Sequence, residues 1–172
     1  MNLLLLSPDD LIDTNQAVIR DRRLQHLHQV HRAEVGQTLR AGMLNGAMGQ
    51  ARIEQLHSDQ ALLSLDLQQQ PPAKLPLTLV LALPRPKMLK RTLQTIAAMG
   101  VQKLVLVNSY RVEKSFWQTP WLSPEAIHEQ LLLGLEQACD TVLPEVILEK
   151  RFKPFVQDRL PALTADSLRL VA

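Results

Sequence analysis

The sequence predicts a two-domain α+β protein, with a small β-barrel or sandwich over residues 1–70 and an α/β domain with a parallel sheet over residues 75–172. Before residue 70, short apolar runs alternate with turn residues, whereas after residue 75 longer apolar runs alternate with segments of helical period. Between them, residues 68–74 read Gln-Gln-Gln-Pro-Pro-Ala-Lys, a polar stretch that favours a linker. We place this linker at residues 71–74.

The composition is that of a folded globular protein. Of the 172 residues, 46% are apolar and 21% are charged, and the net charge is +2, which excludes intrinsic disorder. Cys139 is the single cysteine, so a disulfide framework and a cysteine-rich zinc site are also excluded. The apolar run Leu3–Leu6 is too short for an export signal or a membrane span, so we expect a cytoplasmic protein that does not associate with membranes.

The first domain is predicted to consist of short strands and one helix. Asn45-Gly46 favours a hairpin turn between two of the strands. Leu24, Leu27 and Val30 recur every three residues, which predicts a helix over residues 23–31 that caps or crosses the barrel. The predicted strands correspond to the apolar runs at residues 3–6, 17–19, 39–43, 50–56 and 62–67.

The second domain is predicted to alternate strands with helices, which implies a parallel sheet. Gly100 is suited to end the first long helix, and Ser123 followed by Pro124 is suited to begin the second. The side chains of the second helix that are expected to face the core are those of Ile127, Leu131, Leu135 and Ala138. The predicted strands lie at residues 77–83, 103–107, 145–148 and 168–172, and a shorter helical piece lies at residues 155–163.

Positive charge is concentrated in one part of the second domain. Residues 85–114 carry seven basic side chains and one acidic side chain, a net charge of +6. Loops at the carboxyl ends of parallel strands meet at one edge, so these charges can converge on a polyanion such as RNA. A solvated helix face has the same pattern, and charge alone leaves both interpretations open. The predicted RNA-contacting residues are Arg20, Arg22, Arg23, His26, Arg32, Arg85, Lys87, Lys90, Arg91, Arg111 and Lys114.

Motifs for several other chemistries are missing from the sequence. It contains no G-x-G-x-x-G, no P-loop and no G-x-S-x-G elbow, which disfavours a small-molecule α/β enzyme and a hydrolytic triad. His26, His28 and His31 do not predict a metal site, because only His28 and His31 would share a face of an α-helix. No catalytic residue stands out, and Arg111 and Gln137 are the candidates.

Several segments of this sequence resemble the 16S ribosomal RNA uridine-N3 methyltransferases. Residues 23–32, followed by Val35-Gly36 and Ile53, are similar to the N-terminal RNA-binding domain of that family. The segments that follow the order of its methyltransferase domain are Leu79–Leu83, Pro84-Arg85-Pro86-Lys87-Met88, Met99-Gly100-Val101, Ser109-Tyr110-Arg111, and Glu136-Gln137 to Pro144-Glu145. These motifs are collinear over nearly the whole chain.

The resemblance implies a PUA-like barrel joined to a SPOUT-type methyltransferase domain. Proteins of this family are homodimers that transfer a methyl group from S-adenosylmethionine to N3 of a uridine in the 16S ribosomal RNA of the small ribosomal subunit. The resemblance implies that Arg23 and Arg32 position RNA, that Arg85 and Lys87 lie near the cleft, and that Arg111 stabilises charge on the uracil or on a phosphate.

The resemblance also implies a knotted cofactor site formed by a Gly-Pro-Glu-Gly-Gly segment and a Leu-Arg-x-Glu-Thr segment. Neither segment occurs in these 172 residues. We therefore expect a truncated enzyme with an incomplete knot, inactive by itself, in which Leu170, Val171 and Ala172 adjoin the cofactor. The alternative is a non-catalytic RNA-binding or ribosome-assembly protein that is complete at residue 172.

Overall fold

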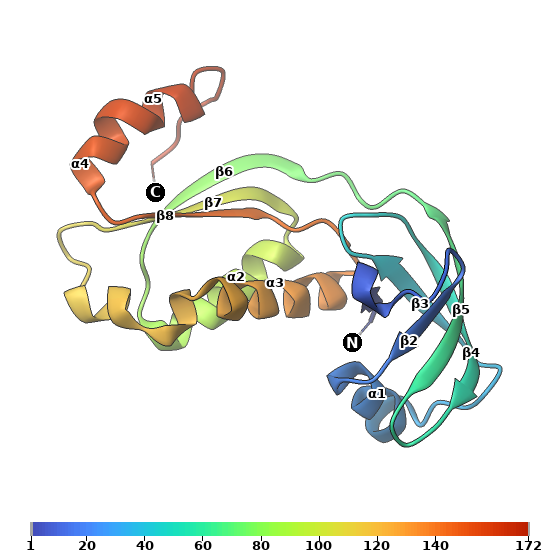
Figure 1. Cartoon of the computed structure of the whole chain (residues 1–172). Coiled ribbons are helices and arrows are strands. Elements are labelled where there is room, and N and C mark those ends of the chain that lie inside the picture. The colour runs from blue at the N-terminus through green and yellow to red at the C-terminus, as the bar shows by residue number, and fades with distance from the viewer. Residues whose placement is uncertain (1, 172) are drawn as a thin grey trace.

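The structure is a computed structural model that describes residues 2–171. It has a mixed α/β fold with two sheets (Figure 1). A curled sheet of five strands, in the order β1-β3-β4-β5-β2, comes from the first part of the chain. A parallel sheet of three strands, in the order β6-β7-β8, comes from the second part and confirms the predicted parallel pairing.

The curled sheet follows the predicted apolar runs closely. Its strands are β1 (Leu4–Leu6), β2 (Gln16–Ile19), β3 (Thr38–Met43), β4 (Met48–Leu56) and β5 (Ala61–Gln69). The predicted hairpin joins β3 to β4, where Asn45 adopts a left-handed φ of 56° and the Gly46 amide donates to the Met43 carbonyl at 2.8 Å. Within residues 2–171, the edge strands β1 and β2 pair with β3 and β5 and not with each other, so the predicted barrel is an open, curled sheet.

The four leucines at the start of the chain are all buried because β1 lies between two cores. Leu4 and Leu6 pack inside the curled sheet, with Ile19, Ile53 and Leu63 among their neighbours in that core. Side chains alternate along a strand, so Leu3 and Leu5 point the other way, into the core of the second half. A continuous apolar run in an edge strand is therefore explained by burial on both faces.

A short helical segment crosses the open end of the curled sheet. Helix α1 spans Arg22–His26, and the chain continues as a π-helical turn over Leu27–His31. Leu24 and Leu27 are buried in the core of the curled sheet, which confirms the helix predicted for residues 23–31.

Two helices cover one face of the parallel sheet (Figure 1). The chain order is β6 (Leu75–Ala82), α2 (Pro86–Ala98), β7 (Val101–Val107), two 3-10 turns (Lys114–Gln118 and Pro120–Leu122), α3 (Pro124–Ala138) and β8 (Glu145–Glu149). Leu89 and Leu93 of α2 and Leu131 and Leu135 of α3 pack on the sheet. As predicted, Gly100 adopts a positive φ of 69° after α2, and the Ser123 hydroxyl accepts from the Ala126 amide at 3.2 Å.

The prediction that Ala138 faces inward is wrong. It is the last residue of α3 and is exposed. The chain turns sharply at the next residue, Cys139, whose φ of 56° is left-handed. Helix α3 therefore ends at Ala138, whose side chain is left in solvent.

The segment after β8 lies on the opposite face of the parallel sheet. It consists of α4 (Phe152–Pro154), a π-helical turn (Phe155–Arg159) and α5 (Leu160–Leu163), which confirms the short helical piece predicted there. Phe155 is buried against Val105 and Val107 of β7. Within residues 2–171, no helix is long and apolar enough to cross a membrane.

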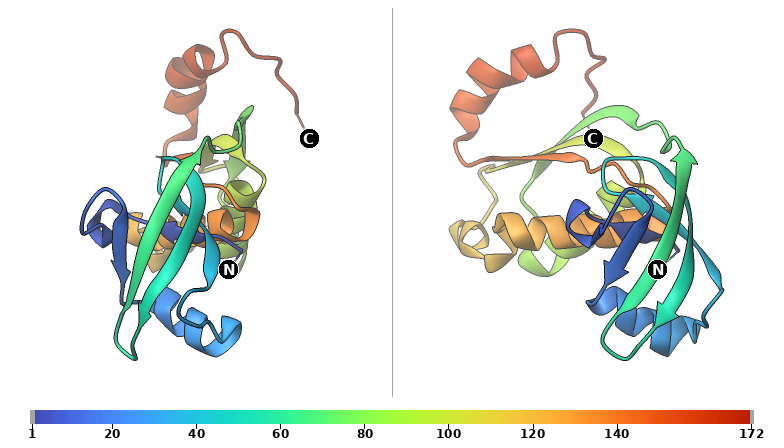
Figure 2. Two further views of the ribbon diagram at one scale, coloured as in Figure 1. Left: turned by 90° about the vertical axis from the view of Figure 1, so that its right-hand side faces the viewer. Right: turned by 45° about the vertical axis from the view of Figure 1, so that its right-hand side comes forward.

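The predicted strand at residues 168–172 is wrong for the residues that the structure describes. Residues 168–171 form no strand, and Leu168, Leu170 and Val171 are 86%, 84% and 101% exposed. After α5 the tail is drawn as plain coil (Figure 2), and neither sheet includes a strand from it. Apolar alternation alone does not make a strand without a partner strand. Ala172 lies outside the described residues.

The C-terminal end of α3 fastens the two sheets together. The amides of Asn2 and Leu3 both donate to the Glu136 carbonyl at 3.1 Å. The Lys74 ammonium pairs with Asp140 at 2.5 Å, and the Thr141 hydroxyl donates to the Gly46 carbonyl at 2.7 Å. Polar contacts therefore join the part of the chain before the predicted linker at residues 71–74 to the part after it, and Lys74 of the linker is itself in an ion pair.

Candidate nucleic-acid interface

The carboxyl ends of the three parallel strands are held together by hydrogen bonds. The Leu83 amide donates to the Val107 carbonyl at 2.9 Å, which joins the ends of β6 and β7. Asn108 joins β7 to β8, because its amide donates to the Glu149 carbonyl at 3.1 Å and its Nδ2 donates to the Lys150 carbonyl at 3.3 Å. The segments that leave these strands therefore start from adjacent points and can present one common surface.

Basic side chains dominate the three segments that leave this edge. Residues 85–91, 108–114 and 149–153 contain nine basic and two acidic side chains, a net charge of +7. We call the nine basic residues the carboxyl-edge basic surface: Arg85, Lys87, Lys90, Arg91, Arg111, Lys114, Lys150, Arg151 and Lys153. All except Lys90 are exposed, and those eight side chains form no hydrogen bond or ion pair within residues 2–171. Their charges are therefore available to an anionic partner.

Lys90 differs from the other residues of this surface because its side chain contacts another side chain of the protein. Its ammonium lies 3.2 Å from the centroid of the Trp121 ring, in the position of a cation–π contact. Trp121 precedes α3, so the contact ties α2 to the turn before α3. Lys90 therefore has a structural partner as well as a place on the basic surface.

Three basic residues of this surface were missed by the sequence analysis. Lys150, Arg151 and Lys153 follow β8 directly and are exposed. The signal that could have found them is the run Lys-Arg-Phe-Lys immediately after a predicted strand, by the same reasoning that selected Arg85 and Arg111. The hydrogen bond from Asn108 to Lys150 shows that this run begins beside the loop after β7.

Within residues 2–171, every donor of Arg23 has a partner, so none is free for a phosphate, contrary to the sequence-based prediction. The residue is 8% exposed, and its five N–H groups are matched by the Leu5 carbonyl and by the carboxylates of Asp10 and Asp21, at 2.7 to 3.0 Å. Burial disfavours the charge, but the hydrogen bonds to Asp10 and Asp21 outweigh it and raise the pKa of Arg23. Arg23 thus ties β1 to the segment after β2, where the curled sheet is open.

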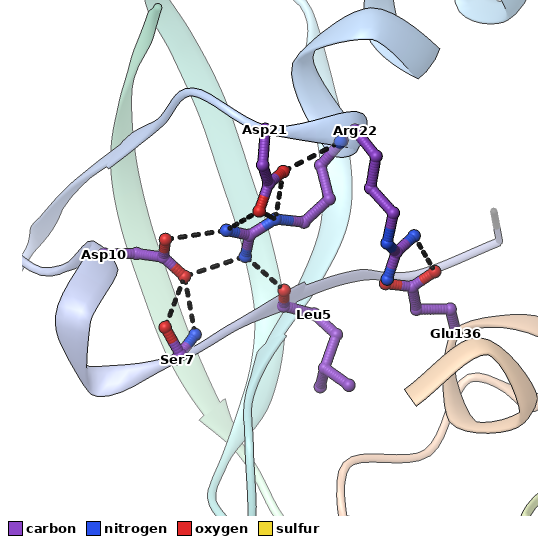
Figure 3. Close-up of polar contacts among 7 residues, drawn as sticks. Leu5, Ser7, Asp10, Asp21, Arg22 and Glu136 are labelled. Carbon is purple, nitrogen blue, oxygen red and sulfur yellow. Dashed lines mark hydrogen bonds and ion pairs between the residues drawn. The ribbon is translucent and has the colours of Figure 1, made fainter. Parts of the chain in front are cut away.

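Arg22 also has a partner inside the protein. Its guanidinium donates two hydrogen bonds to Glu136 of α3, at 2.9 and 2.6 Å (Figure 3). The hydrogen bonds that Arg22 donates to this carboxylate raise the pKa of Arg22. The Glu136 side chain is 4% exposed and that of Arg22 is 41% exposed, so the pair connects the helix of the curled sheet to the second half of the chain.

The other predicted contacts of the curled sheet differ in their surroundings. Arg20 is exposed and donates two hydrogen bonds to the Gln60 side chain, at 3.2 and 3.0 Å. Arg32 is exposed, adopts a left-handed φ of 46°, and has no side-chain partner within residues 2–171. His26 is half-buried, and burial lowers the pKa of its imidazole. Arg32 is therefore the most available of these groups.

The π-helical turn changes which histidines meet. Sequence reasoning with an α-helix paired His28 with His31, but the rings of His26 and His31 are the ones in contact, with centroids 4.9 Å apart. A π-turn brings residues five apart together, which an α-helix does not. The Nε2 atom of His28 lies instead 2.9 Å from the His57 carbonyl oxygen. Within residues 2–171, no group of three or more His, Cys, Asp or Glu side chains is placed to hold a metal ion.

The two candidate catalytic residues lie at opposite ends of the parallel-sheet half. Arg111 follows β7 at the carboxyl edge, whereas Gln137 is at the end of α3, where Asn2 and Arg22 contact Glu136. Helix α3 has 15 residues and so spans about 22 Å between these regions (Figure 1). Gln137 lines a cavity of about 430 Å³ with Asn2, Gln94, Leu133 and Glu136. The structure therefore does not bring Arg111 and Gln137 together.

Leu170 and Val171, which are predicted to adjoin the cofactor, lie on the exposed tail after α5. Leu170 and Val171 are almost fully exposed, and neither lines the cavity beside Gln137 or a second cavity of about 180 Å³ beside the Arg22–Glu136 pair. Their predicted position in a strand is also wrong, as described above. Ala172 lies outside the described residues.

A comparison with known protein families gives a match to the RNA methyltransferase domain over residues 71–171. The matched region begins at the predicted linker and includes the carboxyl-edge basic surface. The chain belongs to this RNA methyltransferase family. Membership agrees with the family resemblance of the sequence at the level of RNA methyltransferases.

A relative in sequence matches most of the chain. The "Ribosomal RNA small subunit methyltransferase E" of Treponema pallidum (strain Nichols) is 30% identical over 158 residues, which are 90% of this chain and 59% of that protein. The chain thus spans less than two thirds of the length of this RNA methyltransferase family member.

Several solved structures share the fold of the present chain. A probable rRNA-methyltransferase from Porphyromonas gingivalis has a TM-score of 0.71 at 19% identity, and covers 94% of this chain and 66% of its own. The ribosomal RNA small subunit methyltransferase E of Neisseria gonorrhoeae, bound to S-adenosyl methionine, has a TM-score of 0.69 at 20% identity with the same coverage. A putative methyltransferase from Legionella pneumophila, in complex with SAM, has a TM-score of 0.65 at 18% identity, covering 92% of this chain and 66% of its own.

These comparisons do not support the expectation that the main cofactor-binding segments are absent. The RNA methyltransferase domain matches the chain through residue 171, and two of the structural neighbours contain the cofactor. They also do not favour the alternative of a non-catalytic assembly protein, because the matching family and the named relative are methyltransferases.

Proposed function

We propose that this chain acts in the methylation of small-subunit ribosomal RNA, at N3 of a uridine, with S-adenosylmethionine as the methyl donor. The carboxyl-edge basic surface carries the proposal. In a member of the RNA methyltransferase family, eight exposed cations that have no partner among residues 2–171 can supply the charge that holds an RNA backbone. The relative from Treponema pallidum supports the small-subunit RNA as substrate. Two structural neighbours with bound cofactor support the donor.

The proposed division of labour follows the two sheets. Residues 1–70 would form a PUA-like RNA-binding domain with Arg32 and Arg20 as contacts, and the part after residue 75 would form a SPOUT-type methyltransferase domain that works as a homodimer in the cytoplasm. Arg85, Lys87, Arg91 and Lys114 would contact phosphates together with the three basic residues after β8. Phosphate contacts fix the position of an RNA but do not read its sequence.

The chemistry at uridine N3 sets requirements that the carboxyl edge can meet in part. N3 carries a proton and must lose it before it attacks a methyl group, so negative charge develops on the uracil. Arg111 is exposed, lies at the carboxyl edge and has no side-chain partner within residues 2–171, so we assign to it the stabilisation of this charge or of an adjacent phosphate. N3 lies on the Watson–Crick edge, so the target uridine must be unpaired or flipped out of its helix.

The cofactor itself would supply an electrophilic methyl group. Leu170 and Val171 are the described residues predicted to adjoin it, and both lie on the exposed tail after α5. We keep them as the proposed neighbours of the cofactor.

Deletion of the gene tests the proposal. Small-subunit ribosomal RNA from the deletion strain, digested to nucleosides and measured by mass spectrometry, should lack 3-methyluridine, and a plasmid copy of the gene should restore it. Unchanged 3-methyluridine in the deletion strain would refute the proposed activity. An assembly defect with unchanged 3-methyluridine would favour the non-catalytic alternative.

A further inference from the structure

Tyr110 is fully exposed at the carboxyl edge. It is the single tyrosine of the chain and is 103% exposed, the highest value among the exposed large apolar side chains. The tryptophans and Phe116 are partly buried, Phe155 is fully buried, and Phe152 is 48% exposed. An aromatic ring has a large apolar face and normally contributes to a core or an interface. A ring left completely in water at a basic edge therefore suggests a partner that covers it.

The turn that carries Tyr110 is firmly anchored. The Val112 amide donates to the Ser109 carbonyl at 3.0 Å, which closes a turn with Tyr110 and Arg111 as its two central residues. Val112 packs against the main core, and Asn108 binds the end of β8 through two hydrogen bonds. Both ends of the turn are thus fixed by contacts with the rest of the protein, and the exposed Tyr110 ring is carried by an anchored turn.

The segments around Tyr110 carry cations whose side chains have no partner within residues 2–171. Arg111 is adjacent in the turn, Lys114 follows it, and the Asn108–Lys150 hydrogen bond places the start of the basic run after β8 beside the same loop. Of the two acids in these segments, Glu149 is paired with Arg159. An exposed aromatic ring among free cations is the combination that binds single-stranded nucleic acid, since bases stack on the ring while the cations contact phosphates.

We propose that Tyr110 is a stacking platform for an unpaired base of the RNA held by the carboxyl-edge basic surface. The proposal rests on the proposed function for its RNA ligand and adds to it that the RNA is single-stranded where it crosses the loop after β7. A base inside a duplex is covered on both faces by its neighbours and cannot stack on this ring. The surface therefore prefers a loop, a bulge or an end to a continuous duplex.

The single tyrosine makes a direct test possible. The chain is produced with 3-fluorotyrosine, which gives one ¹⁹F signal from Tyr110, and is titrated with a uridine-containing single-stranded RNA of about ten nucleotides or with its duplex. The single strand should shift the signal with the same dissociation constant as an independent binding assay. The duplex should bind through phosphates and leave the signal nearly unmoved.

Substitutions separate stacking from charge. Tyr110→Ala should weaken single-strand binding by about 5- to 30-fold, while Tyr110→Phe and Tyr110→Trp should retain the affinity of the original protein. The slope of log affinity against log salt should be unchanged in Tyr110→Ala and reduced by about one in Arg111→Ala. Met99→Ala, which removes an exposed apolar side chain after α2, should leave binding unchanged.

The outcomes distinguish this inference from the proposed function. If single-stranded RNA binds but the ¹⁹F signal does not move and Tyr110→Ala binds as well as the original chain, the stacking role is refuted and the proposed function stands. If Phe and Trp fail to preserve the affinity that Ala loses, stacking is also refuted. If the unaltered chain binds no RNA even at low salt, both the inference and the proposed RNA substrate are wrong.

Discussion

Replacing Arg23 by methionine tests whether this residue serves the fold or the RNA. The structure buries its guanidinium, with a side chain 10% exposed, and surrounds it with Asp10, Asp21 and the Leu5 carbonyl. The Asp10 side chain is 11% exposed, and its carboxylate also accepts hydrogen bonds from the Ser7 amide and hydroxyl. Methionine fills a similar volume but donates no hydrogen bond, so Arg23→Met leaves the Asp10 carboxylate without its main partner.

The size of the effect follows from this burial. Removing one partner of a buried ion pair costs about 3–5 kcal/mol, because the other charge stays in the protein without an opposite charge beside it; the hydrogen bonds from Ser7 to Asp10 place the expected loss at the lower end of this range. For a chain of this length, such a loss lowers the melting temperature by roughly 6–20 °C. Arg20→Met is the matched control, since Arg20 is exposed and bonded only to Gln60, and should cost less than about 1 kcal/mol.

Urea unfolding followed by circular dichroism measures these differences. We expect Arg23→Met to shift the midpoint strongly and Arg20→Met to shift it little. The double variant Arg23→Met, Asp10→Leu should recover part of the loss, because it removes the orphaned carboxylate as well. If Arg23→Met stays within about 1 kcal/mol of the original protein and instead reduces the salt dependence of RNA binding by about one, Arg23 is an RNA contact and our interpretation is wrong.

Three further predictions concern pH, packing and charge. Burial would raise the pKa of Asp10, but the hydrogen bond from Arg23 prevails and holds this pKa below 3.8. The stability that Asp10 adds should therefore be full at neutral pH and be lost as the pH falls through 3.8 toward the lower pKa of the folded state. Arg23→Met should flatten that part of a curve of stability against pH. Gly134→Ala should destabilise the protein by about 1–3 kcal/mol in urea, because its Cβ would lie 2.3 Å from the Gln94 carbonyl oxygen where α2 meets α3; an effect below about 0.5 kcal/mol would show that the helices separate easily. Lys150→Ala should reduce the salt slope of RNA binding by about one without lowering the melting temperature, and an unchanged slope would remove the segment after β8 from the interface.

The sequence allowed most strands and helices to be placed because their signals are local. Asn45-Gly46 marks a hairpin, Gly100 ends a helix and Ser123 begins one, whatever the rest of the chain does. The parallel pairing of the second sheet followed from the alternation of these elements. The exception at residues 168–171 shows the limit, since an apolar stretch becomes a strand only if another strand pairs with its backbone.

The sequence allowed the location of the candidate site to be predicted, but not which residues belong to it. Strand ends gather at one edge of a parallel sheet, so Arg85 and Arg111 could be grouped before the structure was known. Arg23 could not be excluded from the sequence, because its partner Asp10 lies thirteen residues earlier and only the fold brings them together. The same holds for Arg22, whose partner Glu136 comes from the other half of the chain.

Crosslinking tests the central claim, that the carboxyl edge binds single-stranded RNA, most directly. The chain is irradiated with small-subunit ribosomal RNA, and the crosslinked peptides are identified by mass spectrometry. We expect crosslinks in the loop that contains Tyr110 and in residues 150–153, and their loss in a variant that combines Tyr110→Ala with Arg111→Ala. Crosslinks confined to the curled sheet, with residues 108–114 and 150–153 unmodified, would contradict the claim.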